Sequence, residues 1–199
     1  MSCIESPVAK AHVKITSQNR SGQAAIHLAA VGGHLSCIEF LVANGADVES
    51  QDESGRAPIH LATSGGHVSC IECLVAKGAD VNSQDSEGKA AIHLAASEGL
   101  ASCIEILVGA KVNIQDNSGQ TALHFAADLE CIQALVKMQA DVNVRDKEGK
   151  SPLERARQEL MEIPVISEND GDDNENDGED NVLRVTERIA ALEAASLKQ

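Results

Sequence analysis

Apolar and polar positions follow one another in the same order several times along the chain. An apolar run at residues 26–30 is followed by a second apolar stripe at residues 38–42. Both have helical spacing, so the pattern predicts two short helices in each unit. Gly45 ends the second helix, and Gly55 falls where a turn requires a positive φ. Neither helix can bury its apolar face alone, so the core must form between units.

The units recur at a nearly constant period. The turn glycines Gly22, Gly55, Gly88, Gly119 and Gly149 are separated by 33, 33, 31 and 30 residues. A period in this range predicts stacked supersecondary units, whose function comes from the surface that stacking creates. The shorter final spacings predict a compressed fourth unit.

The units also share a sequence motif. Residues 22–30 read Gly-Gln-Ala-Ala-Ile-His-Leu-Ala-Ala, and close variants follow at residues 55–63, 88–96 and 119–127. With the Gly-His, Ile-Glu and Gly-Ala-Asp-Val-Asn blocks that accompany it, the motif resembles the ankyrin repeat. The resemblance covers residues 19–158 and implies an all-α solenoid of helix-turn-helix units joined by β-turn fingers.

We divide the chain into four full repeats with a partial unit at each end. The N-terminal unit aligns Ser2–Glu5 with Ser69–Glu72, and Pro7 predicts a disrupted helix there. The predicted divisions are a degraded half-repeat at 1–18, repeats at 19–51, 52–84, 85–115 and 116–145, a partial capping repeat at 146–166, an acidic disordered linker at 167–181 and an amphipathic helix at 182–199.

Composition narrows the range of partners. The chain has two Phe and no Tyr or Trp, so we expect polar or charge-led contacts rather than aromatic hot spots. A net charge of −15 disfavours direct nucleic-acid binding. No apolar run is long enough to span a membrane and no secretory signal is visible, which predicts a cytosolic or nuclear protein.

The cysteines recur at one position in each unit. Because stacked helices lie about 8–10 Å apart, this column is too widely spaced for disulfides. We therefore expect these thiols to be small core residues: Cys3, Cys37, Cys70, Cys103 and Cys131. Cys73 completes a CxxC pair with Cys70, but no βαβ pattern accompanies it.

The histidines His27, His60, His93 and His124 also recur once per unit. The ankyrin resemblance implies a structural role, in which each histidine bonds a neighbouring turn and a preceding threonine. That threonine is retained only as Thr121, so three hydroxyl bonds should be missing. One histidine per repeat does not provide a metal site, and no catalytic constellation is visible. We expect no cofactor, no metal and no enzymatic activity.

The resemblance also implies a partner-binding surface, made by the β-turn fingers and the concave first-helix face. Three cations share the position after the turn glycine and form a broken basic stripe, which favours an acidic or phosphorylated protein segment. The alternative is a set of ordinary solvated turn residues. The predicted partner-binding residues are Arg20, Gln23, Glu53, Arg56, Ser64, Glu87, Lys89, Glu98, Gln120 and Lys150.

The acidic linker leaves several interpretations open. The three interpretations are a solubilising spacer, a binding site for a basic, histone-like partner, and an intramolecular segment that covers the basic stripe. The helix that follows docks on the last repeat, binds a partner, or mediates weak self-association through residues 182–197. The preferred function is a non-catalytic adaptor, scaffold or inhibitor; the alternative is a chaperone or sequestering factor for a basic protein.

Overall fold

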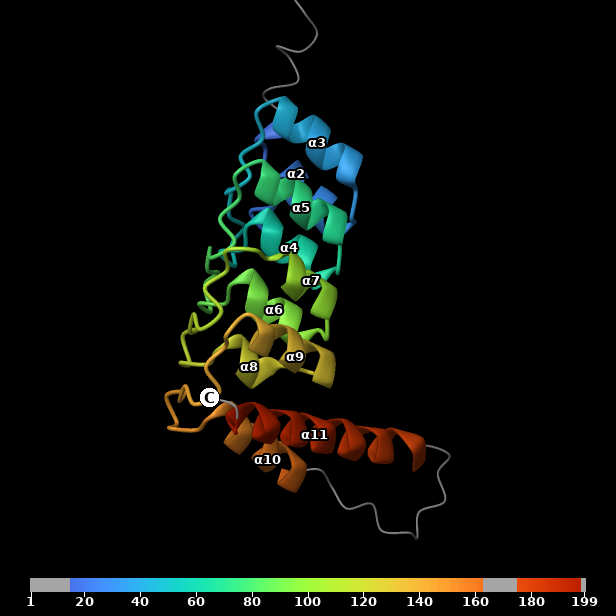
Figure 1. Ribbon diagram of the computed structural model, residues 1–199. Helices are drawn as coiled ribbons and strands as arrows, with labels where there is room; N and C mark the ends of the chain where they lie inside the picture. The colour runs from blue at the N-terminus through green and yellow to red at the C-terminus, as the bar shows by residue number, and fades with distance from the viewer. Residues whose placement is uncertain (1–14, 163–174, 198–199) are drawn as a thin grey trace, which may run out of the picture.

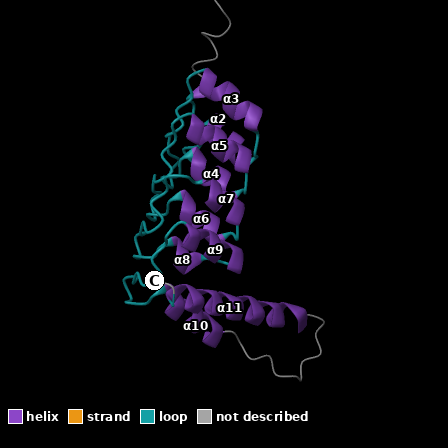
Figure 2. Ribbon diagram, viewed as in Figure 1, coloured by secondary structure: helices purple, strands orange, loops and turns teal. Residues whose placement is uncertain are grey.

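The computed structural model describes residues 15–162 and 175–197, and its helices are stacked in pairs (Figure 1). Within these residues there is no strand, and the turns and loops gather along one edge of the stack (Figure 2). The helices are α2 (Ala25–Val31), α3 (Leu35–Ala43), α4 (Pro58–Ser64), α5 (Val68–Ala76), α6 (Ala91–Ser97), α7 (Ala101–Ile106), α8 (Ala122–Phe125), α9 (Leu129–Lys137), α10 (Pro152–Glu162) and α11 (Glu175–Ser196).

The first helices of the first two repeats are short because each ends at a glycine, Gly32 or Gly65. In the second repeat, Ala57 has an extended backbone and Pro58 opens α4, where its missing N–H costs nothing. Gly65 then caps the helix after seven residues. Small side chains such as Ala62, which is completely buried, allow the adjacent helices to approach closely.

The helices form two layers along the stack. The first helices α2, α4, α6, α8 and α10 contact one another in succession, and so do the second helices α3, α5, α7, α9 and α11. The largest fully buried side chains lie in these layers, among them Ile59, Ile71, Ile92 and Ile104. The core is therefore continuous between repeats, as the repeat pattern requires.

The fourth repeat is compressed within the repeat itself. Its first helix, α8, has four residues where α4 has seven. Asp128 is the N-cap of the second helix, α9. Its carboxylate accepts a hydrogen bond from the N–H of Cys131 at 2.8 Å. Gln139 adopts a φ of +65° at the position that glycine occupies in the other repeats.

The C-terminal helix α11 docks on the last two units of the stack. It contacts α9 and α10, and it buries Val185, Leu192 and Ala195. Two ion pairs join it to α10: Arg157 to Glu193 at 2.7 Å, and Arg188 to Glu159 at 2.8 Å. Of the arrangements left open by the sequence, the structure thus adopts docking on the last repeat.

The predicted boundary between linker and helix is wrong. α11 begins at Glu175 rather than at residue 182, so Asn181 lies inside the helix and does not cap it. The predicted disordered linker therefore fails for residues 175–181, while residues 167–174 lie outside the described residues. Acidic side chains favour the positive end of the helix dipole, which explains why this charged segment extends the helix.

The cysteine column is only partly buried. Cys70, Cys103 and Cys131 are buried, as predicted, but Cys37 is exposed. The prediction fails at Cys37 because no described helix packs on the outer side of α3. Cys3 and the rest of the segment 1–14 of the predicted N-terminal half-repeat lie outside the described residues.

Candidate partner-binding surface

Each finger is closed by one acidic or amide side chain. In the second repeat, one carboxylate oxygen of Asp52 accepts hydrogen bonds from the N–H of Ser54 at 2.9 Å and of Arg56 at 3.0 Å. The turn then reverses at Gly55, whose φ is +72°. Equivalent side chains close the other fingers: Asn19, Asp85, Asp116 and Asp146.

Successive fingers are joined by main-chain hydrogen bonds. The N–H of Glu53 donates to the carbonyl of Ser21 at 3.1 Å, and the N–H of Ser86 donates to Ser54 at 3.0 Å. The same bond recurs twice further along, from Asn117 to Glu87 at 2.9 Å and from Lys147 to Ser118 at 2.9 Å. We call this series the finger ladder; it fixes each finger against the next.

The repeated histidines join the first helices to the loops that follow. The N–H of Ala24 donates to Nδ1 of His27 at 3.1 Å, so Nε2 carries the proton and donates to the carbonyl of Ser50 at 2.9 Å. The backbone bond therefore occupies Nδ1 although the threonine hydroxyl is absent. In the fourth repeat, Thr121 Oγ1 lies 3.0 Å from His124 Nδ1 as well. Burial lowers the pKa of His124.

The predicted binding residues separate into two groups by exposure. The finger tips and first-helix ends are exposed, whereas the position after the turn glycine is half-buried in every repeat. The exposed group is Arg20, Glu53, Ser64, Glu87 and Glu98, and the half-buried group is Gln23, Arg56, Lys89, Gln120 and Lys150.

The three cations of the basic stripe already have carboxylate partners within their own fingers. Arg56 pairs with Asp52 at 2.9 Å and Lys89 pairs with Glu87 at 2.9 Å. The hydrogen bond from Lys89 lowers the pKa of Glu87, and the same bond raises the pKa of Lys89. Lys150 pairs with Glu148 at 3.0 Å. The charges of the basic stripe are therefore balanced by carboxylates. The sequence-based prediction missed this balance, although Glu87 and Glu148 precede Lys89 and Lys150 by two residues.

The first-helix face also carries apolar contacts that the sequence analysis did not select. Lys89 Nζ lies 5.4 Å from the ring centre of Phe125, close enough for a cation–π contact. The Phe125 ring meets His93 edge-on, with ring centres 5.9 Å apart. On α2, Leu28 is 53% exposed and Val31 is 50% exposed. The first helices thus add exposed or half-buried apolar side chains to the charged side chains of the fingers.

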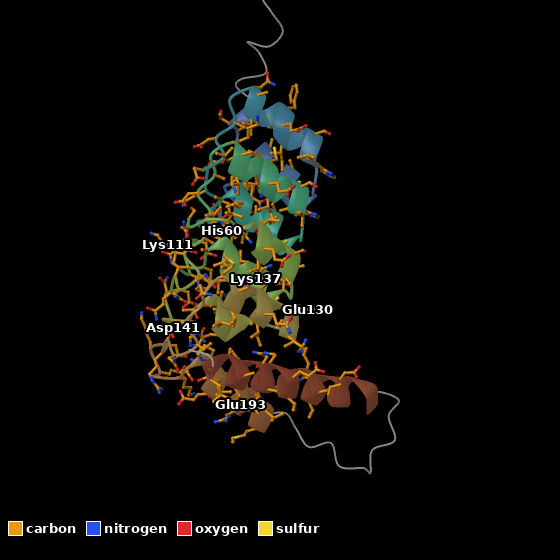
Figure 3. All side chains as sticks on the ribbon, viewed as in Figure 1. His60, Lys111, Glu130, Lys137, Asp141 and Glu193 are labelled. Carbon is orange, nitrogen blue, oxygen red and sulfur yellow. The ribbon has the colours of Figure 1, made fainter. Side chains whose placement is uncertain are left out.

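A second series of bonds holds the loops that precede the fingers. The N–H of Asp80 donates to the carboxylate of Glu49 at 2.8 Å, and the N–H of Lys111 donates to the side-chain oxygen of Asn82 at 2.6 Å. One repeat further, Asp141 bonds Asn113 at 2.8 Å. Figure 3 shows Lys111 and Asp141 along the loop edge of the stack, where their charged side chains are exposed.

The thiols of Cys70, Cys73, Cys103 and Cys131 are poorly suited to nucleophilic chemistry, because each has a raised pKa. Burial, followed by the charge of Glu39, raises the pKa of Cys73, so its thiolate is disfavoured. Burial and the neighbouring Asp128 raise the pKa of Cys131 to about 12. Among the described residues, no group of three or more His, Cys, Asp or Glu side chains is arranged to hold a metal ion.

Comparison with protein families matches the model described as Ankyrin repeats (3 copies) at residues 2–85, 66–146 and 92–163. Because these matches span most of the chain, it belongs to the ankyrin-repeat family. Such repeats generally mediate protein–protein interactions, and their domains are typically non-catalytic. No curated protein matches the chain. Within residues 15–162 and 175–197, no helix has the length and apolar character needed to cross a membrane.

Proposed function

We propose that this protein is a non-catalytic adaptor, scaffold or inhibitor that binds another protein through its fingers and first-helix face. The finger ladder is the observation that carries the proposal. It holds exposed side chains such as Arg20, Glu53 and Glu87 on a rigid backbone, so little conformational entropy is lost on binding.

The contacts within the fingers support a partner with charges of both signs. An acidic or phosphorylated segment reaches Arg56 or Lys89 only by displacing Asp52 or Glu87. The exposed tips carry charges of both signs, such as Arg20 and Glu53, and α2 exposes the apolar side chains of Leu28 and Val31. The partner we propose is therefore a protein segment with charges of both signs and a few apolar side chains.

A matched pair of double variants tests this surface. The finger variant Glu53→Ala/Glu98→Ala removes two exposed carboxylates from a finger tip and a first-helix end. The control variant Glu39→Ala/Glu72→Ala removes two exposed carboxylates from the second helices α3 and α5. Both change the net charge equally and leave the core intact.

Wild type and both variants serve as baits for quantitative affinity capture from native lysate. We expect the main captured protein to decrease about tenfold with the finger variant, which corresponds to about 1.4 kcal/mol, and to stay unchanged with the control. Equal capture by all three baits would place binding elsewhere. A fourth bait truncated after residue 166 tests the alternative of a basic, histone-like partner at the acidic segment, because only that alternative predicts loss with this bait.

A further inference from the structure

The docked face of α11 contains a charged residue at its centre. The buried residues of this helix are spaced three or four apart, which places them on one side: Val185, Arg188, Leu192 and Ala195. Leu183 precedes Val185 by two residues and so lies on the opposite side, where it is 58% exposed. α11 therefore buries an arginine while it leaves a leucine in solvent, which apolar burial alone does not explain.

One carboxylate on α10 compensates the charge of this arginine. Nη1 of Arg188 donates to Oε2 of Glu159 at 2.8 Å, and the two residues come from different helices. Their environments differ, because the side chain of Arg188 is 8% exposed and that of Glu159 is 45% exposed. The buried member of the pair thus depends on a partner that remains accessible to solvent.

The pairing leaves one nitrogen of the arginine unsatisfied. Among the described residues, Nε of Arg188 is the buried side-chain nitrogen or oxygen that has no hydrogen-bond partner within the protein. A buried polar group without such a partner costs about 1–3 kcal/mol. Replacing a buried ion pair by apolar side chains is often neutral or stabilising, whereas removing one partner of the pair is strongly destabilising. The docking of α11 should therefore depend on Glu159 in a way that an apolar interface would not.

A second ion pair between α10 and α11 provides a comparison within the same interface. Nη2 of Arg157 lies 2.7 Å from Oε1 of Glu193, but both side chains are about half exposed, at 53% and 46%. Figure 3 shows Glu193 at this end of the molecule. Exposed pairs contribute about 0–1 kcal/mol, and loss of one partner leaves no charge buried. Two arginines thus join the same two helices, and only Arg188 is buried.

We propose that α11 is a conditional latch, which stays docked only while the carboxylate of Glu159 compensates the buried charge of Arg188. Loss of that negative charge leaves an uncompensated arginine in the interface, so α11 separates from α9 and α10 and returns the arginine to water. Separation also exposes Val185 and Leu192. A change at one half-exposed side chain of α10 is then sufficient to uncover an apolar face at the end of the stack.

Hydrogen exchange of the full chain tests the latch, with mass spectrometry on peptides from residues 180–196. Glu159→Gln removes the charge with little change in shape, and it should accelerate exchange in α11 about tenfold while exchange in α6 stays unchanged. Arg188→Met removes the buried charge and should leave exchange in α11 unchanged or slower. The double variant Glu159→Gln/Arg188→Met should match Arg188→Met, because docking no longer requires the carboxylate. Glu193→Gln is the matched control and should change exchange by less than about threefold.

Four results would overturn the proposal. The first is exchange in Glu159→Gln within about threefold of wild type, which means that docking does not require the carboxylate. The second is equal acceleration by Glu159→Gln in the wild-type and Arg188→Met backgrounds, which means that Glu159 acts independently of the arginine. The third is faster exchange in Arg188→Met than in wild type, which means that the arginine itself holds the helix. The fourth is equal acceleration in α6 and α11, which means that α11 unfolds together with the stack. Circular dichroism of each variant confirms that the stack is folded.

Discussion

The second and fourth repeats differ in length but share a histidine bond to the finger of the next repeat. α4 has seven residues and α8 has four. Even so, His60 Nε2 lies 3.2 Å from the carbonyl of Lys89, and His124 Nε2 lies 3.2 Å from that of Lys150. The shortening falls inside the repeat, where Asp128 begins α9 directly.

This difference shows which constraints the stack imposes. The finger ladder and the histidine bond to the next finger connect one repeat with the next, and both are retained where residues are lost. The deletion shortens α8 and its connection to α9, and even this connection still bonds its neighbour, since the N–H of Ala127 donates to the carbonyl of Ala96 at 3.0 Å. Stability should therefore depend more on contacts between repeats than on the length of any single helix.

The largest expected effect is a loss of stability, compared between α6 in the middle of the stack and α11 docked at its end. Ile92→Ala removes a completely buried side chain from α6, and it should lower the free energy of unfolding by about 2–5 kcal/mol. Leu192→Ala removes a side chain that is 2% exposed in α11. Because α11 contacts only the last units, this loss should appear as faster hydrogen exchange within residues 175–196, with a smaller shift of the urea midpoint. Equal global destabilisation by both variants would mean that α11 unfolds together with the stack.

Acid should destabilise the third and fourth repeats through their buried histidines, His93 and His124. Burial lowers the pKa of His93 and of His124 below the ordinary value of 6.5. The unfolded chain therefore binds more protons below that pH, so the stability these groups contribute is complete above 6.5 and is lost as the pH falls below it. Urea midpoints should stay constant above about pH 7.5 and decrease as the pH falls below 6.5. Asp146 adds a separate loss only below 3.8, because its pKa is lowered in the folded state.

The shortened connection in the fourth repeat should depend on its cap. Asp128→Ala removes the hydrogen bond to the N–H of Cys131 and should cost about 1 kcal/mol. The corresponding residue of the second repeat, His67, makes no side-chain cap bond to α5. Urea denaturation of Asp128→Ala and Asp128→Asn separates the cap from other effects, since asparagine also caps helices. Equal loss in the two variants would argue against the cap.

The smallest effect concerns the turn after the second helix. Gln139 has a φ of +65°, where a side chain is strained, so Gln139→Gly should stabilise the protein by about 0.5 kcal/mol. Gly78, at the equivalent position, has a φ of +96° and open space around it. Gly78→Ala should therefore destabilise by about 1 kcal/mol through the backbone alone. Thermal melts test whether Gln139→Gly raises the melting temperature and Gly78→Ala lowers it. Destabilisation by Gln139→Gly would show that the glutamine side chain contributes contacts.

Much of the fold could be predicted from the sequence because its determinants are local. Turn glycines such as Gly55, the histidine motif and the apolar stripes each lie within one repeat, and the family match supports them. The docking of α11 could not be predicted, because it depends on pairs such as Arg188 and Glu159, which are 29 residues apart. Docking on the last repeat, binding of a partner and self-association all fit the apolar pattern of this helix equally well.

The candidate site was less accessible to prediction for a related reason. The exposure of a residue such as Cys37 depends on what packs against it, and the Ser-Cys-Ile-Glu motif around it is identical in the first three repeats. The charge balance of the stripe depends on side-chain geometry within each finger. Spacing alone placed Glu87 near Lys89, but it did not show that their charges are paired.

The finger ladder has an evolutionary consequence. Its bonds join main-chain atoms, so the side chains of Arg20, Glu53 and Glu87 contribute nothing to them. Mutations at these tips can accumulate one at a time without eroding the scaffold. Substitutions at the tips can therefore change the partner while the stack is kept. A tip sequence transferred from one repeat to another would be held by the same main-chain hydrogen bonds.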